Sequence, residues 1–74
     1  MGQEIIEVPL TGKIISISVK PGDKVKEGDT LCLLESMKME NPILAPLEGT
    51  ITQVGIVVEQ IVKPGETIAI IDYE

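Results

Sequence analysis

An internal repeat is the feature that most constrains this chain. Residues 12–35 align without a gap on residues 49–72, an offset of 37 in a chain of 74 residues. Six aligned positions are identical, and several others exchange one aliphatic or acidic residue for another. A unit this short cannot bury an apolar face alone, so we expect the two copies to pack on each other as a pseudo-twofold pair of sheets. The repeat therefore predicts one domain over residues 1–74.

The side-chain chemistry of the repeat favours strands. The chain has 12 Ile and 7 Val but one aromatic residue, Tyr73, and β-branched side chains pack well on a pleated surface. Apolar and small polar residues alternate over residues 15–19, which is typical of a half-buried strand. Further strands are expected over residues 4–8, 30–35 and 67–72 and near Val25, with Pro-Gly or Gly turns at 20–23, 27–29 and 63–66. We therefore predict an all-β fold, in which residues 57–60 replace the first Pro-Gly turn but lack its glycine.

Composition argues against several classes of function. The chain has no His, no Arg and one Cys, so we expect neither catalytic residues nor a metal site, and a buried, structural Cys32. A net charge of −6 opposes binding to nucleic acid. No apolar run approaches the length of a membrane span, and the N-terminus lacks a signal-peptide pattern. We expect a cytoplasmic protein that does not insert into membranes.

The segment between the two copies breaks a local rule. A strand that ends near Glu35 and another that starts near Met39 leave room for a tight turn at Met37-Lys38. Two-residue hairpins favour Asn-Gly or Asp-Gly, because both central residues often need a positive φ. Shifting Lys38 by 37 residues leads to the chain termini, so the turn should lie at the opposite end of the domain from them. A broken rule in a consistent fold predicts function, here an outward-facing lysine.

The residues around this turn carry a family resemblance. Glu35-Ser36-Met37-Lys38-Met39-Glu40, followed by Ala-Pro at 45–46 and Gly-Thr at 49–50, resembles the biotinyl domain of biotin-dependent carboxylases and decarboxylases. The resemblance extends over residues 8–72. It implies a flattened β-barrel, or barrel-sandwich hybrid, of two four-stranded antiparallel sheets.

The same resemblance implies a cofactor and partners. Biotin would be amide-linked to Lys38 by biotin protein ligase, which would recognise Met37 and Met39, and we add Glu35, Ser36 and Glu40 as candidate contacts. The carrier would then shuttle a carboxyl group between a biotin carboxylase and a carboxyltransferase or decarboxylase. The acceptor stays open among acetyl-CoA, propionyl-CoA, pyruvate and a decarboxylase cycle.

Two alternative functions stay open at this point. A lipoyl carrier resembles the same fold and also modifies a hairpin lysine, but that lysine usually follows an acidic residue, whereas Lys38 lies between two methionines. The other alternative is an unmodified barrel module that only binds partners.

Overall fold

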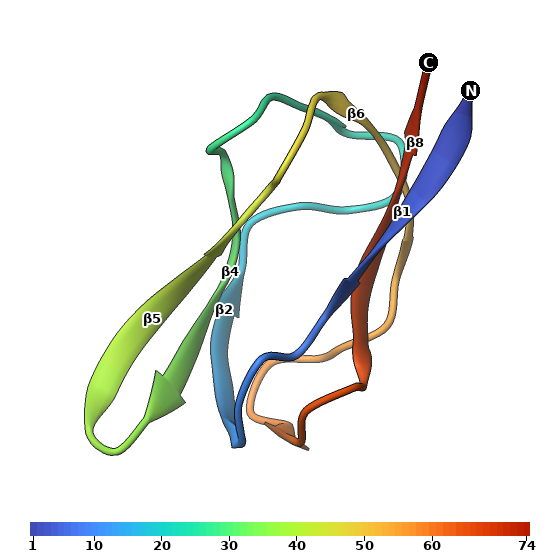
Figure 1. The fold of residues 1–74 in the computed structure, drawn as a ribbon. Helices are drawn as coiled ribbons and strands as arrows, with labels where there is room; N and C mark the ends of the chain where they lie inside the picture. The colour runs from blue at the N-terminus through green and yellow to red at the C-terminus, as the bar shows by residue number, and fades with distance from the viewer.

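The computed structural model describes all 74 residues and contains eight strands joined by turns (Figure 1). The strands are β1 (Gly2–Glu7), β2 (Gly12–Ile17), β3 (Lys24–Val25), β4 (Thr30–Ser36), β5 (Met39–Leu44), β6 (Gly49–Val54), β7 (Ile61–Val62) and β8 (Thr67–Tyr73). The structure contains no helix long and apolar enough to cross a membrane.

The strands form two antiparallel sheets of four. Their orders are β1-β8-β6-β3 and β5-β4-β2-β7, which confirms the predicted two four-stranded antiparallel sheets. Each repeat copy gives its short strand to the sheet that the other copy dominates, since β3 pairs with β6 and β7 pairs with β2. The two copies are therefore interlocked and do not merely lie side by side.

The offset of 37 holds for every strand and for the connections between them. It relates β2 to β6, β3 to β7, β4 to β8 and β1 to β5. The 14 backbone hydrogen bonds outside the regular ladders also form related pairs. For example, Val8 N donates to Glu66 O at 2.8 Å, and Ala45 N donates to Asp29 O at 2.8 Å. The sequence repeat thus predicts the backbone path and the hydrogen bonds of the turns.

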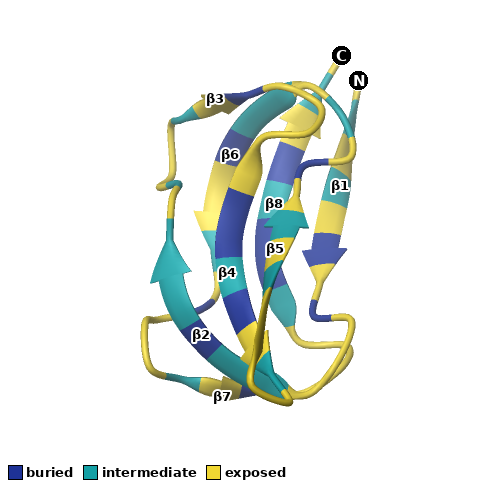
Figure 2. Ribbon diagram, turned by 90° about the vertical axis from the view of Figure 1, so that its left-hand side faces the viewer, coloured by how far each residue is buried: buried dark blue, intermediate teal, exposed yellow.

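The core between the sheets is aliphatic and follows the same symmetry. It contains 14 buried residues, all apolar, and 12 of them form six pairs related by the offset of 37. Figure 2 shows the buried segments of β4 and β6, while the connections at both ends are mostly exposed. Gly12 and Gly49 are one identical pair of the repeat, and a Cβ at either would collide with a backbone carbonyl oxygen, of Glu35 or Asp72. These glycines are required because two strands approach each other closely there.

One strand prediction needs a correction. The strand predicted over residues 15–19 is β2, Gly12–Ile17. Ile17 and Val19 pack against the core as the alternation implies, but the fully buried residue of this strand is Ile14 and not Ile15. The pairing register with β4 shifts between Ile14 and Ser16, which is a β-bulge. A bulge adds one residue and reverses the side-chain alternation beyond it, so the pattern that is right for Ile17 and Val19 does not extend back to Ile15.

The turn that lacks its expected glycine keeps the glycine conformation. Glu59 has a φ of 78°, and Gly22, its counterpart in the first copy, has a φ of 98°. Glu59 N donates to Ile14 O at 2.8 Å, as Gly22 N does to Ile51 O at 2.7 Å. The hydrogen bonds of the symmetric fold therefore hold a non-glycine residue in the left-handed region, at a cost of about 1–2 kcal/mol.

This strain predicts that Glu59→Gly stabilises the protein. Removing the Cβ should raise the free energy of unfolding in urea by about 0.5–1 kcal/mol, because glycine takes a positive φ without steric cost and the added freedom of the unfolded chain offsets part of the gain. The exposed ion pair between Lys13 Nζ and Glu59 Oε1 at 3.3 Å would be lost, but such pairs contribute little.

Gly22→Ala is the matched control. Nothing lies within 4 Å of a Cβ built at Gly22, so the loss of stability that we expect there, about 1 kcal/mol, measures the backbone term alone. A Glu59→Gly variant less stable than the wild type would contradict the prediction and show that the ion pair outweighs the strain.

Candidate functional site

The hairpin that joins β4 and β5 has the turn that the sequence predicts. Ser36 pairs with Met39 as the last rung of the ladder, and Met37 and Lys38 form the two-residue loop. Their φ angles are 53° and 65°. Two consecutive positive φ values are those of a type I′ turn, which Asn-Gly adopts without strain and Met-Lys does not.

Symmetry places this loop at the far end of the molecule from the termini. The pair Ser36–Met39 at the hairpin corresponds to the pair Tyr73–Gly2 in the other sheet, where the chain begins and ends. Figure 1 shows the β4–β5 loop at the lower left and both termini at the upper right. The predicted position of the lysine turn is confirmed. The molecule is elongated, with principal extents of 36 × 18 × 16 Å, so the two ends are well separated.

The tip of the hairpin is open to solvent. Met37 is 92% exposed and Met39 is 66% exposed, so neither methionine is a core residue. Lys38 is exposed and its ammonium makes no ion pair or hydrogen bond within the chain. Exposed methionines lose the stabilisation that burial of their side chains would give, which is of the order of 2 kcal/mol for a fully buried methionine. Nothing in this fold requires two methionines here.

The remaining predicted site residues lie on the strands just behind the loop. Glu35 and Glu40 are directly opposite each other on β4 and β5 and are both exposed, and Ser36 next to them is half-buried. Like charges directly opposite on a sheet are destabilising. Lys13 on β2 is opposite Glu35 on its other side, but its ammonium pairs with Glu59 and not with the hairpin.

Asn41 is a residue of this site that the sequence interpretation missed. Its side-chain Nδ2 donates to Leu34 O at 3.3 Å and to Met39 O at 3.2 Å, so it connects both strands of the hairpin. Leu34, its cross-strand partner, is fully buried in the core. The sequence signal for this role is weak, because an asparagine before Pro42 whose side chain made no hydrogen bonds would look the same in the sequence. The structure shows that Asn41 couples the strained loop to the rigid body.

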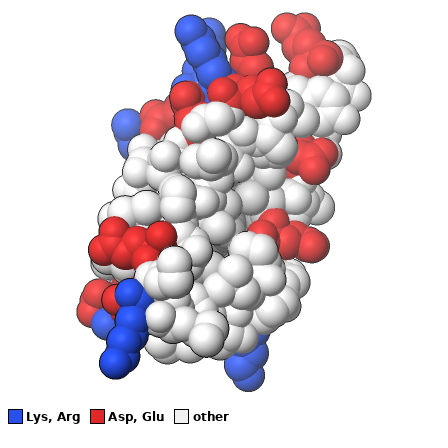
Figure 3. All heavy atoms as spheres, turned by 60° about the vertical axis from the view of Figure 1, so that its left-hand side comes forward, with Lys and Arg blue, Asp and Glu red and all other residues white.

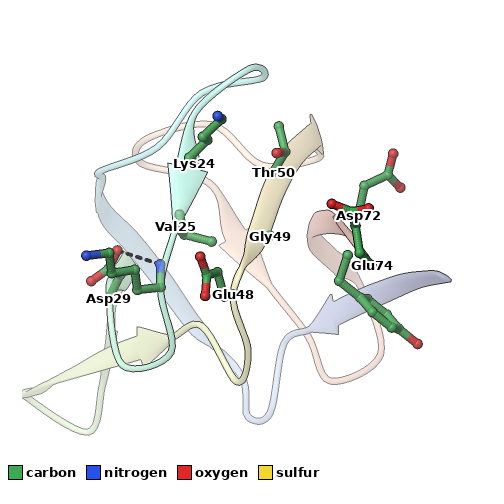
Figure 4. Close-up of a pocket in the computed structure, with 10 residues that line it drawn as sticks. Lys24, Val25, Asp29, Glu48, Gly49, Thr50, Asp72 and Glu74 are labelled. Atoms are coloured by element: carbon green, nitrogen blue, oxygen red, sulfur yellow. Dashed lines mark hydrogen bonds between the residues drawn. The ribbon is translucent and has the colours of Figure 1, made fainter. Parts of the chain in front are cut away.

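The two hollows on the surface do not involve the hairpin. The larger one, of about 590 Å³, lies at the end that carries the termini and is lined mainly by charged residues (Figure 4). Its lining includes Lys24, Asp29, Glu48, Asp72 and Glu74. The smaller one adjoins the N-terminal residues. Lys38 is therefore presented by the hairpin alone and is not held in a pocket of its own chain.

The one cysteine lies in the core, as predicted. Cys32 is fully buried, and burial raises the pKa of its thiol to about 11. The thiolate is the nucleophilic form of cysteine, so this residue contributes no reactive group to the hairpin.

Comparison with known proteins identifies the family to which such a hairpin belongs. Residues 4–71 match the family described as biotin-requiring enzyme. The chain belongs to this family. It is a biotin carboxyl carrier domain, which is a carrier component and not a catalyst.

Individual relatives agree with this assignment. The chain is 37% identical over 68 residues to a Mycobacterium leprae protein named biotinylated protein TB7.3 homolog, and covers 96% of it. It is 44% identical over 52 residues to the methylmalonyl-CoA decarboxylase subunit gamma of Veillonella parvula, of which it covers 40%. A crystal structure of Kluyveromyces lactis urea carboxylase superposes with a TM-score of 0.88 over 97% of this chain, at 25% identity, but this chain matches only 6% of that one.

The hairpin is compatible with the biotin that this family requires. Lys38 offers a primary amine, the group that forms an amide with a carboxylic acid. Because the loop is exposed and the ammonium makes no ion pair or hydrogen bond within the chain, an acyl group can be added without breaking an interaction of the fold. No buried polar side-chain atom lacks a partner, so no buried alternative site for the cofactor is indicated.

The positive φ values predict that the loop sequence is not the most stable one for this turn. We expect Met37→Asn with Lys38→Gly to raise the free energy of unfolding by about 1–2 kcal/mol, since these residues adopt a type I′ turn without strain. Urea titration monitored by circular dichroism measures this change. Met39→Asn, at an extended strand position beside the loop, is the control and should bring no gain. A double variant no more stable than the wild type would show that Met-Lys is unstrained.

Burial of Cys32 predicts a specific loss of stability at alkaline pH. Its pKa is raised in the folded state, so the contribution is fully present below the pKa of the unfolded thiol, near 9, and is lost as the pH rises toward 11. Over this window the free energy of unfolding should fall by on the order of 2 kcal/mol more than in Cys32→Ala. Parallel curves for the two proteins between pH 8 and 11 would contradict the assignment.

Proposed function

We propose that residues 1–74 form one biotinyl domain and that Lys38 is its biotin attachment residue. The observation that carries the proposal is the position of this lysine among the six in the chain. Lys38 alone occupies the tip of a two-residue hairpin, at the end of the molecule opposite the termini. The matched family requires biotin, and the mycobacterial relative is named as biotinylated.

The chain's contribution to attachment is presentation and not activation. The ammonium of the lysine loses one proton, the free amine forms a C–N bond with the activated carboxyl carbon of biotin as the leaving group departs, and the nitrogen loses a second proton to become the amide N–H. No residue of this chain is placed to remove those protons, because the ammonium has no hydrogen-bond partner here. A biotin protein ligase must supply that group. The net charge of the chain changes from −6 to −7 when the ammonium becomes an amide.

We propose that the ligase recognises the exposed methionines on either side of the lysine. Met37 and Met39 give a flexible apolar contact on both sides of the amine, and methionine adapts readily to a partner surface. Glu35, Ser36 and Glu40 extend this surface along the strands. A loop that already has the type I′ shape needs no reordering when the ligase binds, which lowers the entropic cost of recognition.

The length of the arm that biotin would form on Lys38 supports the carrier role. Biotin supplies, when attached, a ring nitrogen that carries a carboxyl group. The lysine side chain and the biotin chain together give an arm of roughly 13 Å. We propose that this arm, with movement of the whole domain, connects a biotin carboxylase with a carboxyltransferase or decarboxylase. Tethering keeps the effective concentration at each site on the order of millimolar. We further propose that the domain works in the cytoplasm, where a single unpaired cysteine remains reduced.

The test is intact-mass analysis of the chain produced in cells with an active biotin ligase and biotin. We expect the wild-type chain to gain the mass of one biotinyl group and Lys38→Arg to gain none. Lys63→Arg is the matched control, since Lys63 is also exposed and lies in the β7–β8 turn, and it should be modified like the wild type. A lipoyl increment, or an unmodified wild-type chain, would overturn the proposal.

A further inference from the structure

The two ends of the molecule differ in a way that the fold does not require. Positions 20 and 24 in the first copy are lysines, and their counterparts in the second copy are Val57 and Ile61. Val58 between them replaces a proline. The exposed fraction is 64% for Val57, 48% for Val58 and 63% for Ile61. We call these three aliphatic side chains the apolar patch.

The backbone under the patch matches its counterpart in the first copy. Gln60 N donates to Val57 O at 3.2 Å, as Asp23 N does to Lys20 O at 3.0 Å. Ile61 is paired with Lys13 on β2 as Lys24 is paired with Thr50 on β6. The same turn and strand therefore accept lysine at both positions. Since the fold accepts charged residues there, the exposed aliphatic side chains are not explained by folding.

The patch is on the same sheet as the lysine hairpin. β7 is the edge strand of the sheet β5-β4-β2-β7, and Ile61, Lys13, Glu35 and Glu40 are in register across it. This row is one residue away from the Ser36–Met39 pair that closes the hairpin. Three strand spacings separate Ile61 from Glu40, a distance of about 14 Å. Figure 2 shows β7 and the β4–β5 loop at the lower end, with the termini at the upper end.

We propose that the apolar patch is the docking surface for the component that exchanges the carboxyl group between biotin and the organic substrate, a role that rests on the proposed carrier function. A contact about 14 Å from the hairpin would orient Lys38 toward that component's active site without covering the lysine. The decarboxylase and carboxylase relatives each act, by their names, on an acyl-CoA or a carboxylic acid. Such substrates are anionic, and basic side chains at the entrance of that active site would attract them.

Charge around the patch complements such an entrance. Glu35, Glu40 and Glu59 lie in or beside the row, and Lys13 in the row is paired with Glu59. Two further cations are near, Lys63 just after β7 and Lys38 at the hairpin, and the second loses its charge when it is acylated. Figure 3 shows acidic side chains along the whole length of the molecule, with the largest group at the upper end and basic side chains at both ends. An apolar contact bordered by carboxylates fits a partner with an apolar surface bordered by lysine or arginine, and the complementary potentials speed the encounter.

The size of the patch fits a transient partner and not a second copy of this chain. Stable interfaces bury about 800 Å² on each partner, and three aliphatic side chains supply a small part of that area. A carrier must leave each active site after every transfer, so a small contact suits its task. Self-association through the patch would instead require a larger apolar surface, which the surrounding carboxylates interrupt.

The experiment exchanges residues between the two ends. Val57→Lys with Ile61→Lys installs the side chains that the fold already accepts at positions 20 and 24. The matched control, Lys20→Val with Lys24→Ile, places the same apolar side chains at the other end. All chains also carry Lys38→Arg, so that binding is measured without biotin, by calorimetry against the purified carboxyl-exchanging component of the source organism. We expect the patch variant to bind at least about tenfold more weakly and the control to bind like its parent.

Further measurements separate this inference from the proposed function. With Lys38 restored, the patch variant should gain biotin as the wild type does, because ligase recognition uses the hairpin tip. Unchanged binding by the patch variant, or equal weakening in both variants, would overturn the docking surface while leaving the carrier role intact. A parent chain that dimerises in sedimentation through the patch would also overturn it. A wild-type chain that never gains biotin would instead refute the proposed function.

Discussion

The whole structure depends on the aliphatic layer that the two repeat copies bury between them. Neither copy has an apolar face that closes on itself, and each completes the other's sheet with a short strand. The layer contains no aromatic residue, so its packing relies on aliphatic side chains, most of them in pairs related by the repeat. Interiors of this kind are packed as densely as organic crystals, which makes the body rigid. Rigidity is what a carrier needs from the part of the molecule that carries no chemistry.

The symmetry of this layer also decides where the lysine can be presented. A pseudo-twofold body built from one chain has two equivalent ends, and at one of them the chain starts and stops. At the other end the loop of two residues joins β4 directly to β5, whereas the counterparts of these strands, β8 and β1, are not joined. The core and Asn41 hold that loop in a conformation that Met-Lys does not prefer. Strain of this kind persists where the surrounding structure determines it, and it is common at functional sites.

Most of the fold could be predicted from the sequence because the repeat supplied a second copy of nearly every element. The helix-forming residues around 33–40 would be ambiguous alone, but the aligned segment at 67–72 favours a strand, and β4 confirms it. Bulges could not be predicted, since an inserted residue leaves no compositional trace, and Ile14 rather than Ile15 fills the core for that reason. Asn41 was missed because its role depends on two backbone oxygens that only the folded hairpin brings together.

A duplicated fold gives an internal control for separating structural from functional residues. Where the copies agree against ordinary preference, as at Gly12 and Gly49, the backbone leaves no alternative. Where they disagree on the surface, the fold accepts either residue, so the choice reflects something outside it. The segment from Val57 to Ile61 is such a departure, and like the Met37-Lys38 loop between the copies it lies at the end without termini and contains a non-glycine residue at a positive φ. All three non-glycine residues with a positive φ are at this end, which supports our proposal that partners bind there.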